Sequence, residues 1–114
     1  MKPEEVLQRL QELNINVGDR TLRDWKNKGL IPQPKTGSYG QGLGRWADYP
    51  DETIPEGVAG YNLLHHDLYR MKIEAAAIIR KQAKAIMQEG LDLQSIDCPF
   101  TKIWIEKYIS VQQR

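Results

Sequence analysis

The stretch VGDRTLRDWKNKGLIPQP, residues 17–34, has the clearest structural pattern in the chain. Leu22 and Trp25 stand three residues apart, and basic and polar residues fill most of the positions around them. Gly29 stands where a left-handed residue commonly ends a helix. The pattern predicts a short amphipathic helix over residues 19–28, with one apolar face and one basic face.

A second helix is predicted immediately before this one. Apolar residues recur at helical spacing from Pro3 to Leu13, and proline at the start of a helix costs little because its missing amide has no partner there. Asn14 to Gly18 interrupt the pattern with residue types that accept turn conformations. Two short helices joined by a turn predict a helix-turn-helix, in which the second helix enters the DNA major groove.

The next segment, residues 30–49, is predicted to form a loose β-hairpin. Its two prolines favour extended backbone, and a glycine-rich tip supplies conformational freedom through Gly37, Gly40, Gly42 and Gly44. A hairpin that follows a recognition helix is a wing, which commonly contacts the phosphate backbone. Lys35 and Arg45 would stand near its base.

A further helix is expected to begin at Thr53, which has capping-box spacing to Glu56. Neither glycine nor proline occurs between Tyr61 and Glu89, so one helix of up to 29 residues is predicted, with an interruption near His65-His66-Asp67 left open. A stripe at 3-4 spacing would suit pairing with a second copy or packing within one chain; it contains Tyr61, Leu64, Leu68, Met71, Ala75, Ile78, Gln82 and Ala85.

The chain is expected to end in a helix that opens at Cys98-Pro99, after Gly90 has closed the preceding one. One face of this last helix is aromatic and apolar, with Phe100, Trp104, Tyr108 and Val111. The 114 residues suffice for a DNA-binding unit and a pairing helix, but leave no room for a separate sensor or catalytic domain. We therefore expect a division at residues 1–67 and 68–114.

Charge is unevenly distributed along the chain although the formal net charge is only +1. Residues 20–46 carry six basic side chains and one acidic one, whereas residues 47–67 carry five acidic side chains and neither lysine nor arginine. Such asymmetry indicates a surface that faces a nucleic acid, although a solvated face is the common alternative. One cysteine, no apolar run of membrane length and no signal-peptide pattern predict a cytoplasmic protein without membrane contact.

With these features in view, the sequence resembles the MerR family of winged-helix bacterial transcriptional regulators, in a short form without an effector-binding domain. The resemblance lies in Thr21-Leu22-Arg23, in Gly29-Leu30-Ile31-Pro32 and in Gly44-Arg45-Trp46 at the exit of the wing. Trp25 replaces the family's usual tyrosine, and its indole N–H could donate in place of the hydroxyl.

The resemblance implies a mainly α fold, with a winged helix-turn-helix, a small β-hairpin wing and a long C-terminal helix. It further implies a dimer that binds double-stranded DNA sequence-specifically, with helix 19–28 in the major groove and wing 30–49 on the backbone. RNA polymerase is a further candidate partner. The expected DNA-contacting residues are Arg20, Thr21, Arg23, Trp25, Lys26, Lys28, Lys35 and Arg45.

Two other functions stay open: an excisionase-like or architectural DNA-binding factor of a mobile element, and a non-catalytic protein–protein adaptor. No residue pattern predicts catalysis, so we expect no enzymatic activity and no cofactor. The glycine-rich run lacks the Gly-Lys-Ser/Thr ending of a nucleotide-binding loop. His65 and His66 would point about 100° apart on a helix, so no metal site is expected.

Overall fold

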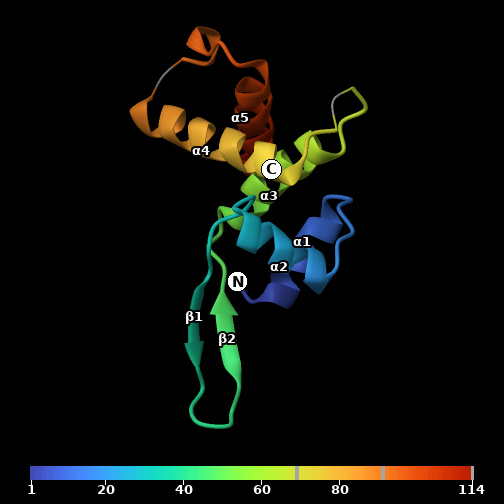
Figure 1. The fold of residues 1–114 in the computed structure, drawn as a ribbon, viewed down its shortest axis with the longest axis vertical. Coiled ribbons are helices and arrows are strands. Elements are labelled where there is room, and N and C mark those ends of the chain that lie inside the picture. The colour runs from blue at the N-terminus through green and yellow to red at the C-terminus, as the bar shows by residue number, and fades with distance from the viewer. Residues whose placement is uncertain (69, 91, 114) are drawn as a thin grey trace.

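The computed structural model describes residues 1–68, 70–90 and 92–113 and is mainly helical with one small antiparallel β-hairpin, as predicted. In Figure 1 helix α3 lies at the centre, with α1 and α2 on one side, α4 and α5 on the other, and the hairpin projecting away from the body. The elements are α1 (Pro3–Glu12), α2 (Asp19–Lys28), β1 (Lys35–Ser38), β2 (Arg45–Asp48), α3 (Thr53–Leu64), α4 (Ile73–Glu89), a 3-10 turn (Leu93–Ser95) and α5 (Pro99–Gln112).

The two N-terminal helices have the bounds that the sequence pattern predicts, to within one residue. Gly29 adopts a left-handed conformation, with φ of 83°, at the end of α2. Its N–H donates to the Lys26 carbonyl, and the Leu30 N–H donates to the Trp25 carbonyl. Asn14 takes up φ of 66° in the turn between the helices, a conformation that asparagine tolerates better than most residues. Leu22 and Trp25 are both buried, so the apolar face of α2 is confirmed.

Helix α3 is buried along most of its length, from Thr53 to Gly60 and again at Leu63. A helix that is enclosed on every side cannot show a one-sided apolar stripe. Two glycines let its neighbours approach closely: Gly57 faces Ile31 and Leu10, and Gly60 faces Leu30. Helix α3 is therefore the element on which both halves of the chain pack.

Alanine at Gly60 is expected to lower the free energy of unfolding by about 1 to 2 kcal/mol, whereas alanine at Gly57 should be neutral or slightly stabilising. A Cβ on Gly60 would lie 2.7 Å from Cγ and Cδ1 of the fully buried Leu30, which has no space to move. A Cβ on Gly57 would meet its nearest atom at an ordinary 3.6 Å, so the higher helix propensity of alanine dominates there. Urea unfolding followed by circular dichroism measures the free energy of unfolding of the two variants. An equal loss in Gly57→Ala and Gly60→Ala would contradict the close contact between Gly60 and Leu30.

The capping box predicted at Thr53 is wrong. Helix α3 is capped at Glu52 without a side-chain hydrogen bond, and Thr53 Oγ1 has no partner within the described residues. Glu56 does not bond back to the start of the helix; its carboxylate binds Arg80 and Lys84 of α4 instead. Two cations are stronger partners for a buried carboxylate than a backbone amide is.

A continuous helix from Tyr61 to Glu89 is also wrong, although its interruption near His65 is confirmed. Helix α3 ends at Leu64 and α4 begins at Ile73, while the Met71 N–H donates to the Leu63 carbonyl at 3.0 Å. The break shifts the helical phase, so the predicted stripe does not form one seam. Within α4 its members are exposed, namely Ala75, Ile78, Gln82 and Ala85, and the buried face consists of Ala76, Ala77, Ile79 and Ala83.

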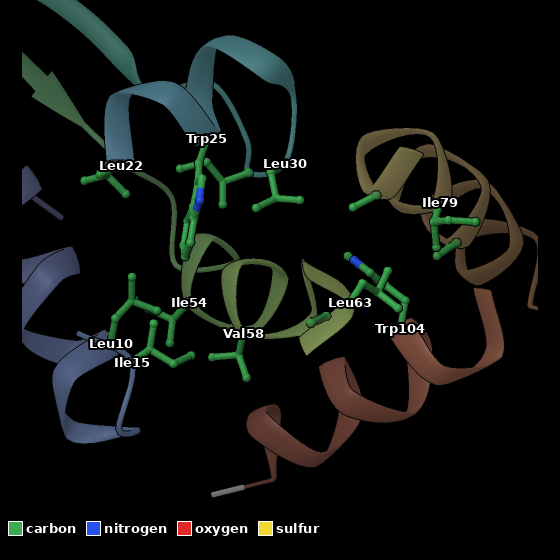
Figure 2. Close-up of a cluster of buried hydrophobic side chains, with 14 of the residues drawn as sticks. Leu10, Ile15, Leu22, Trp25, Leu30, Ile54, Val58, Leu63, Ile79 and Trp104 are labelled. Atoms are coloured by element: carbon green, nitrogen blue, oxygen red, sulfur yellow. The ribbon is translucent and has the colours of Figure 1, made fainter. Parts of the chain in front are cut away.

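Helix α5 packs on α3 and α4 with the face that the sequence predicts. Trp104 is fully buried, and Phe100, Tyr108 and Val111 are half-buried against the same core. Figure 2 shows Trp104 of α5 beside Leu63 of α3 and facing Ile79 of α4, while Leu22 and Trp25 cover the other side of α3. One hydrophobic cluster thus extends from Leu10 to Trp104, across both segments that the sequence pattern separates.

Candidate nucleic-acid interface

An open groove of about 1500 Å³ lies between the start of α1, one side of α2 and the hairpin. Four basic side chains and two acidic ones line it, and one of the acidic groups, Asp48, is neutralised by the N-terminal ammonium. The lining residues are Lys2, Pro3, Glu4, Arg23, Lys26, Thr36, Gly37, Ser38, Tyr39, Arg45, Trp46, Ala47 and Asp48. The groove therefore has a cationic excess between two projecting elements.

Helix α2 presents a basic face to solvent because successive residues rotate by about 100°. Arg20, Arg23 and Asn27 share the side opposite the buried Leu22 and Trp25, and all three are exposed. Arg23 is 63% exposed and pairs with Asp19 at 3.3 Å. An exposed i,i+4 pair contributes little stability, so the guanidinium can exchange this carboxylate for another anion at small cost.

The structure brings only part of the predicted contact set to the groove. Arg23, Lys26 and Arg45 line it, whereas Arg20, Lys28 and Lys35 lie outside it and Thr21 is half-buried. Lys28 lies toward α4, where its ammonium is 3.5 Å from Asp24 and 3.8 Å from Glu74.

Trp25 does not belong to the exposed surface. Its side chain is 3% exposed and lies against α3, with its ring centroid 6.3 Å from that of Tyr61. The indole N–H that was expected to replace a tyrosine hydroxyl at the DNA backbone is thus part of a core residue. The prediction that Trp25 contacts DNA is therefore wrong, because its side chain is buried.

The hairpin is held by a cross-strand pair in which Gly37 opposes Trp46. Gly37 lies within β1 and has no positive φ, so the prediction that it loosens the tip is wrong. Its missing side chain instead makes room for the Trp46 indole, with which a Cβ at that position would collide. An aromatic ring that covers a glycine across two strands is a known way to stabilise an isolated strand pair.

The hairpin tip exposes large apolar side chains that sequence reasoning did not include in the site. Tyr39 is 61% exposed and Leu43 is 70% exposed. The loop is nevertheless closed by backbone hydrogen bonds, from Tyr39 N–H to the Gly44 carbonyl and from Leu43 N–H to the Gly40 carbonyl, both at 3.1 Å. Of Tyr39 and Leu43, only Tyr39 lines the groove, where Lys2 and Trp46 are further side chains that the predicted contact set lacks. The aromatic residues within and beside the glycine-rich run were the available signal for Tyr39 and Trp46.

The base of the hairpin is fastened to the chain's first residue. The Met1 ammonium lies 2.6 Å from Asp48 Oδ1 and donates to the Tyr49 carbonyl at 2.8 Å, while the Tyr49 N–H donates to the Met1 carbonyl at 2.7 Å. Hydrogen bonding and the positive charge of this ammonium lower the pKa of Asp48 below its ordinary value of 3.8. These contacts position Lys2 at the groove wall.

Acidification is expected to break the ion pair between the Met1 ammonium and Asp48. Because the pKa of Asp48 is lower in the folded chain than in the unfolded one, the pair stabilises the fold above pH 3.8 and is lost as the pH falls through the lowered value. In carbon-detected NMR, the Asp48 carboxyl should titrate with a midpoint below 3.8. A midpoint at or above 3.8 for Asp48 would contradict the contact.

The described residues contain neither a metal-binding cluster nor a membrane-spanning helix. In residues 1–68, 70–90 and 92–113, no three His, Cys, Asp or Glu side chains lie close enough together to share a metal ion. None of the helices over the same residues combines the length and apolar character needed to cross a lipid bilayer. Comparison with known proteins gives no further guide, because no family model, curated protein or solved structure matches this chain.

Proposed function

We propose that the protein is a sequence-specific DNA-binding transcriptional regulator of the MerR type, and that the cationic groove between α2 and the hairpin holds one sugar-phosphate backbone of a duplex. The observation that carries the proposal is the convergence of Lys2, Arg23, Lys26 and Arg45 on this groove. Phosphate contacts supply much of the affinity for DNA, and they come mainly from such side chains. A DNA strand whose sugar-phosphate backbone lay in the groove would have α2 on one side and the hairpin on the other.

Helix α2 has the shape and chemistry for the major groove. An α-helix with its side chains is about 10–12 Å across, which matches a groove about 12 Å wide. Arg20, Arg23 and Asn27 are its most outward side chains, and arginine and asparagine are the usual partners of guanine and adenine edges. Lys26, on the groove side, is better placed for a phosphate.

The hairpin takes the role of the wing on the flanking backbone. Arg45 lines the groove beside Ser38, its partner across the strands, at the tip end of the hairpin and not near its base as expected from the sequence. Lys35 lies at the base, opposite Asp48. Leu43 and Tyr39 at the tip extend the surface beyond these charges. The hairpin therefore offers cations for phosphates and apolar groups for sugars.

A second copy of the chain is part of the proposal. One copy offers few phosphate contacts, and affinities typical of specific regulators require more. The exposed side of α4 supplies a surface for pairing, with Ala75, Ile78 and Ala85 around Gln82. Ile78, the largest apolar side chain of this surface, is 57% exposed.

Selection from random-sequence duplexes tests the function directly. We expect an enriched motif with two-fold symmetry, and an affinity that falls steeply as salt rises. Binding to DNA without a motif would favour the architectural or excisionase-like function. Absence of DNA binding at low salt would overturn the proposal and leave the protein–protein adaptor, for which the exposed Leu43 and Tyr39 would be the contact.

Alanine at Arg23 is expected to weaken binding to the selected duplex about tenfold and to reduce the slope of log affinity against log salt by about 0.9 if the contact is a phosphate. Arg9 provides the matched control, because it is a helical arginine paired with Glu5 at 3.1 Å but lies outside the groove. Arg9→Ala should leave the affinity unchanged. Equal effects of the two substitutions, measured by fluorescence anisotropy, would remove α2 from the interface.

A further inference from the structure

A second hollow lies on the side of α3 that faces the turn of the first two helices. It has a volume of about 210 Å³, and its walls come from the α1–α2 turn, from α3 and from the C-terminal part of α5. Because a water molecule occupies about 30 Å³ in the liquid, the hollow has room for about seven waters or a ligand of similar size. None of its lining residues belongs to the cationic groove.

The floor of this hollow is apolar and is part of the buried core. Ile15 is 4% exposed and Val58 is 5% exposed, and both belong to the core cluster. Leu13 and Val111 complete the apolar wall from the turn and from α5. Such a floor suits a small hydrocarbon group, and it is already formed without a ligand.

The rim of the hollow carries polar groups that the protein leaves without partners. Among the described residues, the side-chain amides of Asn14 and Asn62 make no hydrogen bond, and the Lys107 ammonium pairs with no carboxylate. The rim also contains Tyr61 and His65, whose rings are tilted by 35° with centroids 4.3 Å apart. Solvent-accessible polar groups without protein partners, placed above an apolar floor, are the usual composition of a small-molecule site.

The positive charge at the rim favours a ligand with a negative charge. Of the lining residues that the structure describes, Lys107 is the only lysine or arginine, and none is an aspartate or a glutamate. We infer that the hollow binds a small monocarboxylate whose apolar part is about the size of a phenyl or branched alkyl group. The carboxylate is held by Lys107 and the two asparagine amides, and the apolar part rests on Ile15 and Val58.

The test uses sodium benzoate as the probe and benzyl alcohol as its neutral counterpart, at constant ionic strength. In NMR spectra of the ¹⁵N-labelled protein, benzoate is expected to shift the side-chain amides of Asn14 and Asn62, with a dissociation constant in the millimolar range. Benzyl alcohol should bind about fivefold more weakly, because it lacks the charge that Lys107 attracts. Sodium isovalerate, a branched alkyl carboxylate, should compete with benzoate.

Substitutions in α5 separate this site from unspecific binding. Lys107→Met should weaken benzoate binding about fivefold, whereas Lys102→Met, on the same helix but outside the hollow, should leave it unchanged. Val111→Phe, which fills the hollow from its rim, should abolish binding while the circular dichroism spectrum is retained. Equal effects of the two lysine substitutions, or no shift of these amides with benzoate and isovalerate alike, would overturn the inference, whatever the outcome for DNA.

Discussion

Glutamine at Glu56 is expected to lower the free energy of unfolding by about 3 kcal/mol, although the substitution changes the size of the side chain very little. Glu56 is 1% exposed, and its carboxylate is shared by two cations of α4. Arg80 Nε lies 2.5 Å from one oxygen and Lys84 Nζ lies 3.3 Å from the other. Removing the negative charge leaves the guanidinium, itself only 13% exposed, without its counterion.

The effect should extend to the end of α2. Arg80 also donates from Nη1 to the Gly29 carbonyl at 3.2 Å, where α2 ends and its dipole is negative. The carboxylate of Glu56 thus orients the arginine that connects α4 with the proposed recognition helix. We expect faster amide hydrogen exchange in the last turn of α2 in Glu56→Gln, in addition to a lower urea midpoint.

Glu5→Gln is the matched control for this prediction. Glu5 also pairs with an arginine, Arg9, but both side chains are about half exposed, and an exposed pair contributes about 0.2–1 kcal/mol. A double substitution of Glu56 and Arg80 with methionine should recover most of the lost stability, because it removes both buried charges together. If Glu56→Gln lowers the free energy of unfolding no more than Glu5→Gln does, the ion pairs of Glu56 with Arg80 and Lys84 do not stabilise the fold as proposed.

The sequence predicts the local elements well because their signals are local. Gly29 ends α2 and Gly90 ends α4 through the left-handed conformation that glycine favours, and Pro99 opens α5. Apolar spacing identified the buried faces of α2 and α5 for the same reason. Each of these features depends on residues within a few positions along the chain.

The sequence does not predict features that depend on contacts between residues far apart along the chain. Glu56 has capping-box spacing to Thr53, and only the approach of α4, 24 residues further on, gives its carboxylate better partners. The position of Trp25 in the helical pattern is the same whether its side chain faces DNA or α3. Only the burial of the side chain in the folded chain shows that it faces α3. The groove likewise joins Lys2 to Arg45 through a contact between Met1 and Asp48, which no periodicity could indicate.

Alanine at Trp104 is expected to have the largest effect of any single truncation, a loss of about 3–5 kcal/mol in the free energy of unfolding. The side chain is fully buried, packs with Leu63 and Ile79 in Figure 2, and stacks on Tyr108 with ring centroids 5.3 Å apart. Domains of this size have about 5–15 kcal/mol of stability in total. Trp104→Phe should cost less, because it also removes the buried indole N–H, which has no partner within the described residues.

Trp46→Ala is the control, since this tryptophan lies on the hairpin, is 38% exposed and belongs to no part of the buried cluster. It should change the free energy of unfolding by less than about 1 kcal/mol. The shape of the Trp104→Ala transition carries further information. One cluster joins Leu10 to Trp104, so we expect the whole chain to lose stability as one unit. In Trp104→Ala, the urea midpoint of the helical circular dichroism signal should fall, and amide hydrogen exchange in α1 and α2 should become faster to a matching extent. If residues 1–67 kept their stability while α4 and α5 melted, the two segments would be independent folding units, and α4 would be free to pair with another chain without support from α3.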